Sequence, residues 1–351
     1  MRPIPAAVAA CWLACSLHAG PVTPGSPPDS IWPRVAANMR LVNDEQREIV
    51  DWARYYARKP DATQRLLARS QPFLWYIVEA VERENLPAEI ALLPAIESGF
   101  DPHAASPQRA HGLWQFLPAT GRALGLPTTT QYDARRDPIA STDAAIRYLR
   151  SHYARFGDWH LALAAYNIGA ARLSRLLEAQ PRGTDFWALQ LPRETHEHVR
   201  RLMGMALLVE QPQRFGIRLP TIADRPAAET IALDRPVNLR QAARIAGVPE
   251  AVITVYNPGL GNLDSTSVKR GILLPTAHAQ RLRAALDRTP APIVAPAPKA
   301  RVHVVQPGES LWRIARRYDT SVDALMQHNK LRHAGLIRPG SRIEVPAGTS
   351  S

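Results

Sequence analysis

The spacing of apolar residues changes once along the chain, and this change constrains the fold more than any other feature of the sequence. Before about residue 212, apolar residues such as Ile49, Ala53 and Tyr56 recur three and four positions apart, which is the pattern of amphipathic helices. From Leu219-Pro220 onward, short β-type runs alternate with helical patterns. A chain of 351 residues can form one ordinary domain and one or two small modules. We therefore expect a mainly α protein, with an all-helical domain at 30–215 followed by small α+β modules.

The C-terminal part contains an internal repeat of a strand–helix–helix–strand (βααβ) unit. Three pairs of residues align at one constant spacing: Leu239 with Leu311, Ala243 with Ala315, and Asn257 with Asn329. A Pro- and Ala-rich stretch at 289–300 separates the two copies and has the composition of a semi-rigid linker. We therefore expect a first module at 219–288 and a second module at 301–347.

The first 19 residues have the layout of a secretory signal peptide. Arg2 precedes an apolar, Ala-rich run from Ile4 to Leu17, and this run is too short to span a bilayer. Cys15 follows Leu13-Ala14, as in a lipoprotein signal, and cleavage near Ala19 is the alternative. We expect an exported protein of the periplasm or cell envelope, whose only contact with the membrane is a lipid anchor on Cys15.

Cysteine usage and net charge limit the kinds of site and partner that the chain can have, but they do not identify the partner. Both cysteines, Cys11 and Cys15, lie inside the leader, so the folded part has no disulfide and no cysteine metal site. The net charge of +12 favours an anionic partner. The arginines are spread over the helical stretches, so charge alone leaves nucleic acid, membrane surfaces, a cell-wall polymer and a merely soluble basic surface all open.

Glu97 closes a helical stretch whose other residues, from Leu86 to Ile96, are almost all apolar. A lone glutamate near a helix end is usually a solvated charge, but this setting predicts a carboxyl group at a partly buried site. Burial raises the pKa of a carboxylic acid, and a general acid needs a raised pKa to keep its proton near neutral pH. Glu97 is therefore the candidate acid/base.

Three ordered elements resemble the soluble lytic transglycosylase family, which has a lysozyme-like fold. They are Glu97-Ser98, Gly112-Leu113-Trp114-Gln115 with Trp in the place of Met, and Ala165-Tyr166-Asn167 followed by Gly169. The resemblance implies a lysozyme-like domain that cleaves the β-1,4 bond between N-acetylmuramic acid and N-acetylglucosamine in peptidoglycan. It also implies 1,6-anhydromuramic product ends and no cofactor.

The same resemblance implies a role for each matching residue. Glu97 protonates the glycosidic oxygen and then acts as a base. Five residues contact the substrate, namely Ser98, Gly112, Gln115, Tyr166 and Asn167. Gln115 and Asn167 meet polar groups of the sugars, and Gly112 lets the backbone approach them. Ser98 as a helix-end cap and Tyr166 as a core aromatic are the structural alternatives.

One position departs from the family's pattern. The family has a tyrosine after a Glu-Thr pair in a late helix, whereas this chain has His198 after Glu194-Thr195. We include His198 among the substrate-site residues, because its ring can hydrogen-bond the carboxylate of Glu97 and its charge depends on pH. His196 and His198 alone do not make a metal site, so we expect no metal.

Ordinary glycosidases pair two carboxylates across the bond that breaks. The next acids after Glu97 are Asp101, Asp133, Asp137, Asp143 and Asp158, and no glutamate follows until Glu178. All except Asp133 are explained as turn, cap or first-turn residues, and the missing partner fits a route assisted by the substrate's own N-acetyl group. A lysozyme-type hydrolase on the same fold is the alternative. A non-catalytic wall-binding protein is disfavoured, because the candidate site residues all occur together.

The second copy of the repeat resembles the LysM module through Pro307-Gly308-Glu309-Ser310-Leu311 and the ending Val345-Pro346. The resemblance implies a glycan-binding groove bordered by Gly308, Glu309, Ser310, Leu311 and Ile337. The first copy has Arg235-Pro236 where the turn glycine belongs, so we interpret it as a degenerate LysM-like module. We therefore expect peptidoglycan glycan strands as the partner, no nucleic acid, and a monomer.

Overall fold

The computed structural model describes residues 29–129, 131–233, 239–260, 271–288, 301–318, 320–331, 333, 335 and 337–345. The predicted signal peptide with Cys15, the turn at 235–238 and the linker at 289–300 lie outside these residues. The chain divides into two compact units. The first is Met1–Ile231 with Ala251–Asn262 and Leu273–Ala279, and the second is Ala232–Glu250 with Leu263–Ile272 and Gln280–Ser351. In the ranges that are described, no helix has the length and apolar character needed to cross a membrane.

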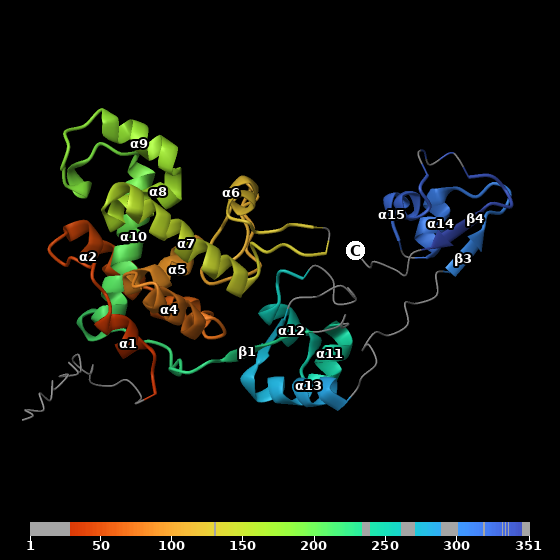
Figure 1. The fold of residues 1–351 in the computed structure, drawn as a ribbon, viewed down its shortest axis with the longest axis horizontal. Helices are drawn as coiled ribbons and strands as arrows, with labels where there is room; N and C mark the ends of the chain where they lie inside the picture. The colour runs from red at the N-terminus through yellow and green to blue at the C-terminus, as the bar shows by residue number, and fades with distance from the viewer. Residues whose placement is uncertain are drawn as a thin grey trace, which may run out of the picture. The chain divides into compact units, whose positions relative to one another are not determined.

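The first unit is built mainly from helices (Figure 1). Those that precede the first strand are α1 (Trp32–Ala37), α2 (Arg47–Ala57), α3 (Pro60–Ala68), α4 (Leu74–Arg83), η1 (Ala88–Leu92), α5 (Leu93–Glu97), α6 (Pro118–Ala123), α7 (Pro138–Phe156), α8 (Trp159–Ile168), α9 (Ala170–Glu178), η2 (Phe186–Ala188), α10 (Arg193–Glu210) and η3 (Pro212–Phe215). The prediction of a mainly α fold is confirmed.

Helix α10 lies at the centre of this unit. It is buried from Leu202 to Val209 and contacts α2, α8, α5 and α1. A Cβ atom at Gly204 would lie 2.4 Å from the Cβ atom of Trp52, so α2 packs on α10 at a distance that only glycine permits. Because α10 also contacts α5, the residues on its first turns lie beside the end of the helix that carries Glu97.

The helical stretch before Glu97 is two elements and not the single helix that its apolar pattern predicts. The 3-10 helix η1 leads directly into α5 at Leu93. Pro94 stands in the first turn of α5, where it has no N–H to donate to the preceding turn and where its ring excludes a continuous α-helix. The break leaves Glu97 at the last residue of a one-turn helix.

Glu89, on η1, is a fully buried carboxylate that the sequence pattern did not single out. One of its oxygens accepts the backbone N–H groups of Arg40, Leu41 and Val42. Burial raises the pKa of Glu89, and these hydrogen bonds oppose the rise. Glu89 therefore fixes the 40–42 loop onto the helix that precedes the candidate acid.

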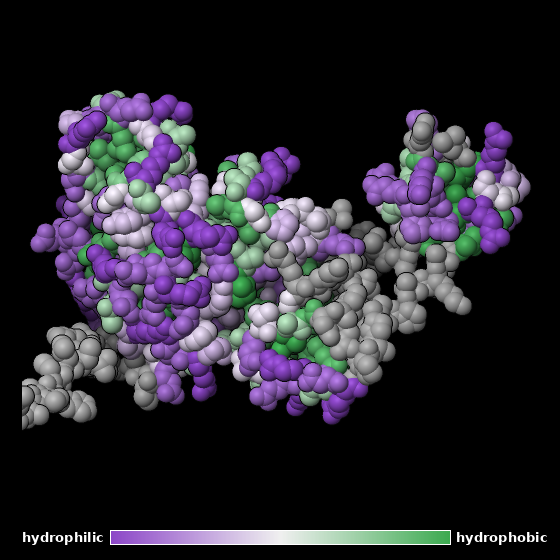
Figure 2. All heavy atoms as spheres, in the orientation of Figure 1, coloured by the Kyte–Doolittle hydropathy of each residue, from purple (hydrophilic) through white to green (hydrophobic). Residues whose placement is uncertain are grey.

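The C-terminal half contains two βααβ units, as predicted. Their elements are β1 (Ala228–Ile231), α11 (Leu239–Ala246), α12 (Glu250–Tyr256), β2 (Ile272–Pro275) and the additional helix α13 (Thr276–Arg288), then β3 (Arg301–Val304), α14 (Leu311–Arg317), α15 (Val322–His328) and β4 (Arg342–Val345). Strands β3 and β4 are antiparallel, with Val302 opposite Glu344. The core of the β3–β4 module includes Leu311, Ile314, Leu325 and Ile343. On the face of this module seen in Figure 2, hydrophilic residues lie on both sides of hydrophobic ones.

The two asparagines that align in the repeat make the same contacts. Asn257 donates its side-chain N–H to the carbonyl of Leu273 at 2.7 Å and accepts the N–H of Leu273 at 2.8 Å. Asn329 exchanges the same pair of hydrogen bonds with Glu344, both at 2.8 Å. In each copy, an amide side chain therefore joins the end of the second helix to the last strand.

Candidate active site

Glu97 ends α5 with a side chain that is 17% exposed, as a carboxyl group at a partly buried site should be. Gly99 and Phe100 follow in the left-handed region, with φ of 63° and 57°. Phe100 is buried, and the carbonyl of Gly99 accepts a hydrogen bond of 2.7 Å from Arg69 Nε. The chain therefore leaves the helix sharply and is held there, with Glu97 at the corner.

The structure brings His198 of α10 to Glu97, as we expected. His198 Nε2 lies 2.8 Å from Glu97 Oε1, and the His198 side chain is only 11% exposed. Its other ring nitrogen, Nδ1, is buried and has no hydrogen-bond partner within the described part of the chain. Because a neutral imidazole carries one N–H, a ring that donates from Nε2 leaves no N–H unsatisfied at Nδ1. This geometry suits a His198 ring that donates from Nε2 to Glu97.

Ser98 joins the end of α5 to the next motif. Its hydroxyl lies 2.9 Å from the carbonyl of Leu113 and 3.2 Å from that of Pro94. Both acceptors are backbone groups, and the Pro94 contact is the helix-end contact of the structural alternative. Ser98 thus fixes the distance between Glu97 and the 112–115 turn.

The 112–115 turn is shaped by left-handed residues and by close packing. Gly112 has φ of 82°, and a Cβ atom there would lie 2.0 Å from the carbonyl oxygen of Arg135. The glycine is therefore required by the Arg135 backbone, a reason other than the approach to sugar that we expected. Gln115 has φ of 49° and donates its side-chain amide to the carbonyl of Gly112 at 2.9 Å. Trp114 is fully buried and donates to Thr142 Oγ1 at 3.0 Å.

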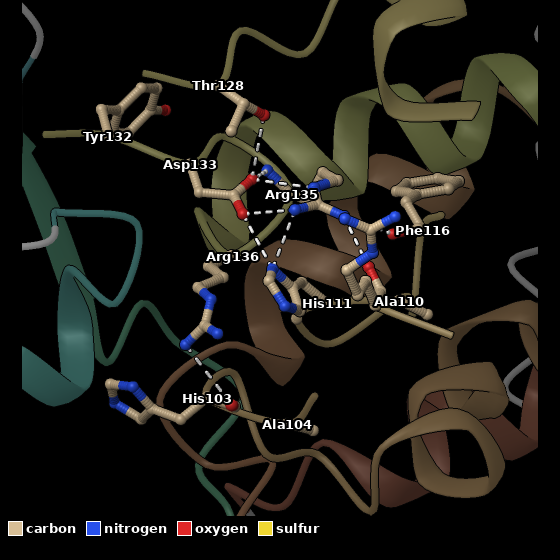
Figure 3. A network of polar contacts seen from close by, with 12 residues as sticks. His103, Ala104, Ala110, His111, Phe116, Thr128, Tyr132, Asp133, Arg135 and Arg136 are labelled. Atoms are coloured by element: carbon tan, nitrogen blue, oxygen red, sulfur yellow. Dashed lines mark hydrogen bonds and ion pairs between the residues drawn. The ribbon is translucent and has the colours of Figure 1, made fainter. Parts of the chain in front are cut away.

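Arg135 holds the 112–115 turn in place. Figure 3 shows Arg135 at the centre of a network of polar contacts. The side chain is 5% exposed. Its guanidinium donates to both carboxylate oxygens of Asp133, at 3.0 and 2.7 Å, and to the carbonyls of Arg109 at 2.8 Å and Phe116 at 3.2 Å. These carbonyls flank the 112–115 turn on both sides. The sequence pattern gave no signal for this role, since the contacts span up to 26 residues.

Asp133, the one acid that the sequence left unexplained, has a structural partner. Burial raises the pKa of Asp133, but hydrogen bonds from Arg135 and His111 oppose it and the net pKa is lowered. His111 Nδ1 lies 2.9 Å from Asp133 Oδ2 (Figure 3). Asp133 is thus held as a charged member of an ion-paired network, which is not the state of a glycosidase acid.

The other four acids also have structural partners. Asp101 accepts the N–H of His103, Asp137 and Asp158 accept N–H groups at the starts of α7 and α8, and Asp143 accepts the hydroxyl of Tyr76. None of these contacts involves Glu97. Over the described ranges, no group of three or more metal-ligating side chains could hold a metal ion.

Helix α8 carries the third motif. Tyr166 donates its hydroxyl to the carbonyl of Trp114 at 2.5 Å and packs its ring 5.9 Å from that of Phe116. Burial raises the pKa of Tyr166 well above its ordinary value, and the negative charge of Glu97 raises it further. Tyr166 therefore lies close to Glu97 and ties α8 to the 112–115 turn. Asn167 is half-buried on α8, and its side-chain amide has no hydrogen-bond partner among the described residues, which leaves the amide open to a ligand.

In the β3–β4 module, several residues predicted to border a glycan groove have internal contacts. Leu311 is a core residue, and Ser310 caps α14 by accepting the N–H of Arg313. Glu309 accepts from buried His303 at 2.7 Å and pairs with Arg317 at 2.9 Å. Backbone hydrogen bonding from Gln306 and the contact with His303 lower the pKa of Glu309. Three further features concern the module's surface: Gly308 is exposed, Ile337 is half-buried, and Trp312 is exposed.

Trp312 is a surface residue that the motif comparison did not single out. Its side chain is 59% exposed on α14, and the guanidinium of Arg316 lies 5.5 Å from its ring. A large apolar indole is seldom left exposed to water on the surface of a soluble protein. An exposed indole beside a cation is typical of a binding face. The signal was present in the sequence, because Trp312 directly follows the core residue Leu311 on a helix and must point away from the core.

Comparisons with known proteins agree with this arrangement. The model of the Transglycosylase SLT domain matches residues 76–187, the LysM domain matches 303–346, and the LysM-like domain of the lytic transglycosylase MltD matches 227–291. Glu97, the 112–115 turn and helix α8 all lie inside the first match, whereas His198 lies outside it. The fold and the site thus define a protein of the lytic transglycosylase class.

The particular family follows from a relative along nearly the whole chain. Membrane-bound lytic murein transglycosylase D of Escherichia coli is 34% identical over 345 residues, which cover 93% of this chain and 75% of the relative. The chain belongs to this family, and it is a lytic transglycosylase that cleaves peptidoglycan. Among solved structures, lytic transglycosylase Slt of Pseudomonas aeruginosa is 24% identical, with a TM-score of 0.32, over 42% of this chain and 25% of that one.

Proposed function

We propose that Glu97 is the single acid/base of peptidoglycan cleavage in this enzyme. Glu97 gives its proton to the glycosidic oxygen as the bond from that oxygen to C1 of N-acetylmuramic acid breaks, and the N-acetyl group stabilises the positive charge at C1. The Glu97 carboxylate then removes the proton of the muramic acid 6-hydroxyl, whose oxygen bonds to C1 and forms the 1,6-anhydro ring. Glu97 ends the cycle protonated, as it began.

One observation carries this proposal. Glu97 stands at the end of a short apolar helix with one oxygen, Oε1, engaged by His198 at 2.8 Å. The engaged oxygen fixes the carboxyl plane and leaves Oε2 for proton transfer to and from the substrate. The structural partners of Asp101, Asp133, Asp137, Asp143 and Asp158 support a route without a second carboxylate. A lysozyme-type hydrolase is the alternative, and it would use water where the 6-hydroxyl is used here.

The substrate contacts divide into two groups. Asn167 and Gln115 meet hydroxyl or N-acetyl groups of the sugars, because both carry side-chain amides at the site and the Asn167 amide has no hydrogen bond with a described residue. Ser98, Gly112 and Tyr166 act by placing the catalytic helix, the 112–115 turn and α8 against one another, as their backbone contacts indicate.

The test is the nature of the product ends. Purified peptidoglycan is digested with the wild type and with Glu97→Gln, which keeps the size of the side chain and removes the transferable proton, and the ends are identified by mass spectrometry. We expect 1,6-anhydromuramic ends from the wild type and a loss of activity of about 100-fold or more in the variant. Reducing muramic acid as the main end would establish the hydrolase instead, and full activity of Glu97→Gln would remove Glu97 from the mechanism.

We also propose how the enzyme is retained at its substrate. The helical domain at 30–215 cleaves, and the LysM module at 301–347 holds glycan strands, with Trp312 stacking on a sugar ring beside the exposed turn at Gly308. The N-terminal signal exports a monomer to the periplasm, and cleavage before Cys15 leaves that residue as the lipidated N-terminus that anchors the protein to the membrane. Membrane fractionation of the wild type and of Cys15→Ser tests the anchor. If Cys15 carries no lipid, the wild type and the variant are both released to the soluble fraction.

A further inference from the structure

A short segment of the first LysM-like module contacts the helical domain. Residues 256–260 end α12 and continue into the turn after it, and all of them belong to the first compact unit. The carbonyl of Gly259 accepts the N–H of Asp133 at 2.8 Å, and Leu260 forms an antiparallel bridge with Tyr132. At the other end of the segment, the ring of Tyr256 meets that of Phe73 edge-on, with the centroids 6.2 Å apart. The segment is thus fixed on the helical domain at two places.

The contact at Gly259 is close, so that a side chain there would crowd the 132–137 loop. A Cβ atom there would lie 3.0 Å from the carbonyl oxygen of Asp133, 3.0 Å from the ring of Tyr132 and 3.2 Å from the N atom of Asp137. The backbone of Gly259 is not in the left-handed region, so the absent side chain serves close approach and not an unusual turn. Tyr132 in turn donates its hydroxyl to Asp137 at 2.7 Å, which holds the two sides of the 132–137 loop together.

The two copies of the repeat differ at this segment. Asn257, Pro258 and Gly259 are all buried, whereas Asn329 is half-buried and Lys330, the residue after it, is exposed. Both copies hold their asparagine by the same hydrogen bonds to the last strand, so the difference does not arise inside the module. It arises because the first copy is covered by the 132–137 loop.

Asp133 connects this contact to the active site. Its backbone N–H is held by Gly259, and its carboxylate is held by Arg135. The carbonyl oxygen of Arg135 lies against Gly112, and the guanidinium of Arg135 holds the carbonyls on both sides of the 112–115 turn. A continuous series of three contacts therefore runs from Gly259 to the turn that carries Gln115.

We propose that the first LysM-like module positions the active site through this segment. Residues 256–260 brace the 132–137 loop and, through Asp133 and Arg135, fix the 112–115 turn against the catalytic helix. The contact covers the turn after α12, so the function assigned to this turn is intramolecular support of the helical domain. The inference rests on the proposed role of the 112–115 turn in substrate contact.

The test uses Gly259→Val in the full-length chain, with Ala251→Val as the matched control. Ala251 is exposed on α12, the helix that precedes Gly259. The valine at 251 therefore adds bulk without touching the 132–137 loop. We measure kcat and KM on purified glycan strands, and hydrogen exchange at residues 104–137. We expect kcat to fall about tenfold for Gly259→Val, faster exchange at the 132–137 loop and the 112–115 turn, and wild-type values for Ala251→Val.

Two further measurements keep the outcome unambiguous. Circular dichroism at the assay temperature identifies a variant that has unfolded, in which case Gly259→Ala, which adds a single methyl group, replaces it. Faster exchange at the loop with unchanged kcat overturns the positioning role, and so does a loss of kcat without any change in exchange at residues 104–137. Glu97→Gln is inactive in either case if Glu97 is the acid, so failure of this inference is separable from failure of the proposed function.

Discussion

The pairing of His198 with Glu97 is the contact in this site with the most direct bearing on proton transfer. A histidine can present the same N–H geometry as a neutral hydroxyl donor, but it can also take up a second proton. His198 donates from Nε2 to Glu97, and its buried Nδ1 has no hydrogen-bond partner in the described structure. His198 is therefore a positioning residue for Glu97.

Replacing His198 separates positioning from packing. His198→Phe removes the donor to Glu97 Oε1 and keeps a ring, so we expect kcat to fall roughly ten- to a hundredfold with little change in KM. His198→Gln keeps an N–H donor and should retain most of the activity. The measurement is kcat and KM on glycan strands across pH 5 to 8 for the three proteins, and equal kcat for His198→Phe and the wild type would contradict the assignment.

At this scale, part of the site could be predicted and part could not. Glu97, Tyr166 and the approach of His198 to Glu97 follow from residue types that stand in recognisable local motifs. The roles of Arg135 and Glu89 could not be predicted in the same way, because Arg135 holds the carbonyl of Arg109, 26 residues away, and Glu89 holds the N–H of Arg40, 49 residues away. The partners of a buried charged side chain are set by tertiary packing, so the neighbouring residues in the sequence do not reveal them.

Among the elements, helix ends were predicted well where side chains cap them. Asp137 and Asp158 accept N–H groups at the first turns of α7 and α8, as their positions before apolar periodic stretches indicate. Asn43, a typical capping residue before the periodic stretch of Ile49 and Ala53, does not cap a helix, since α2 begins at Arg47 and Asn43 accepts the N–H of Glu45 in a turn. The Asn43 side chain was satisfied locally and did not need a helix.

Helix α7 has a titratable group on its buried face, and this makes the stability of the domain depend on pH. His152 packs against the ring of Tyr148, one turn earlier, with the centroids 4.0 Å apart, and its Nε2 is buried without a partner in the described structure. Burial lowers the pKa of His152 from 6.5 to about 4. The folded state therefore excludes a proton that the unfolded chain accepts below about pH 6.5.

The sign of this effect can be measured. Between about pH 6.5 and pH 4 the unfolded chain binds more protons at His152 than the folded chain, so stability falls as pH falls through this window and is fully present above it. We expect the thermal unfolding midpoint of the wild type to drop between pH 7.5 and pH 4.5. His152→Leu should drop less, measured by calorimetry at the two pH values, and an identical drop in both proteins would exclude His152 as a source.

For the whole molecule, the division into a cleaving domain and a wall-holding module predicts two separable activities. Trp312 stands on α14 of the β3–β4 module, whereas Glu97 stands on α5 of the helical domain. Tethering raises the local concentration of substrate without changing the chemical step. Variants of the two residues should therefore affect different measurements.

Trp312→Ala tests this separation. We expect its binding to insoluble peptidoglycan to weaken about fivefold or more, because the loss of one stacked ring costs about 1 kcal/mol, while kcat on short soluble strands stays at the wild-type value. Trp312→Tyr, which keeps an aromatic face, should restore most of the binding. Pull-down with purified peptidoglycan and turnover of soluble strands are the two measurements, and unchanged binding of Trp312→Ala would assign the wall contact elsewhere.

The sequence reveals the two copies of the module but not what each is used for. The alignment of Asn257 with Asn329 reports a shared core, and the hydrogen bonds of the two residues confirm that it is shared. The contact of Gly259 with Asp133 has no such signal, since a glycine after Asn-Pro is equally typical of an ordinary turn. Pairing between surfaces of distant segments is decided by shape, which the local pattern does not record.

The asparagine that joins helix to strand in each copy also bears on how such modules diverge. In each copy the amide bonds to backbone groups of the last strand, so this contact sets no condition on the side chains of the outer surface. In this chain one copy carries the exposed aromatic residue Trp312, and the other carries Gly259 in contact with the helical domain. The hydrogen-bonded asparagine thus lets one βααβ framework carry different surfaces. The same unit can then serve as a spacer, as a support for another domain or as a ligand-binding module.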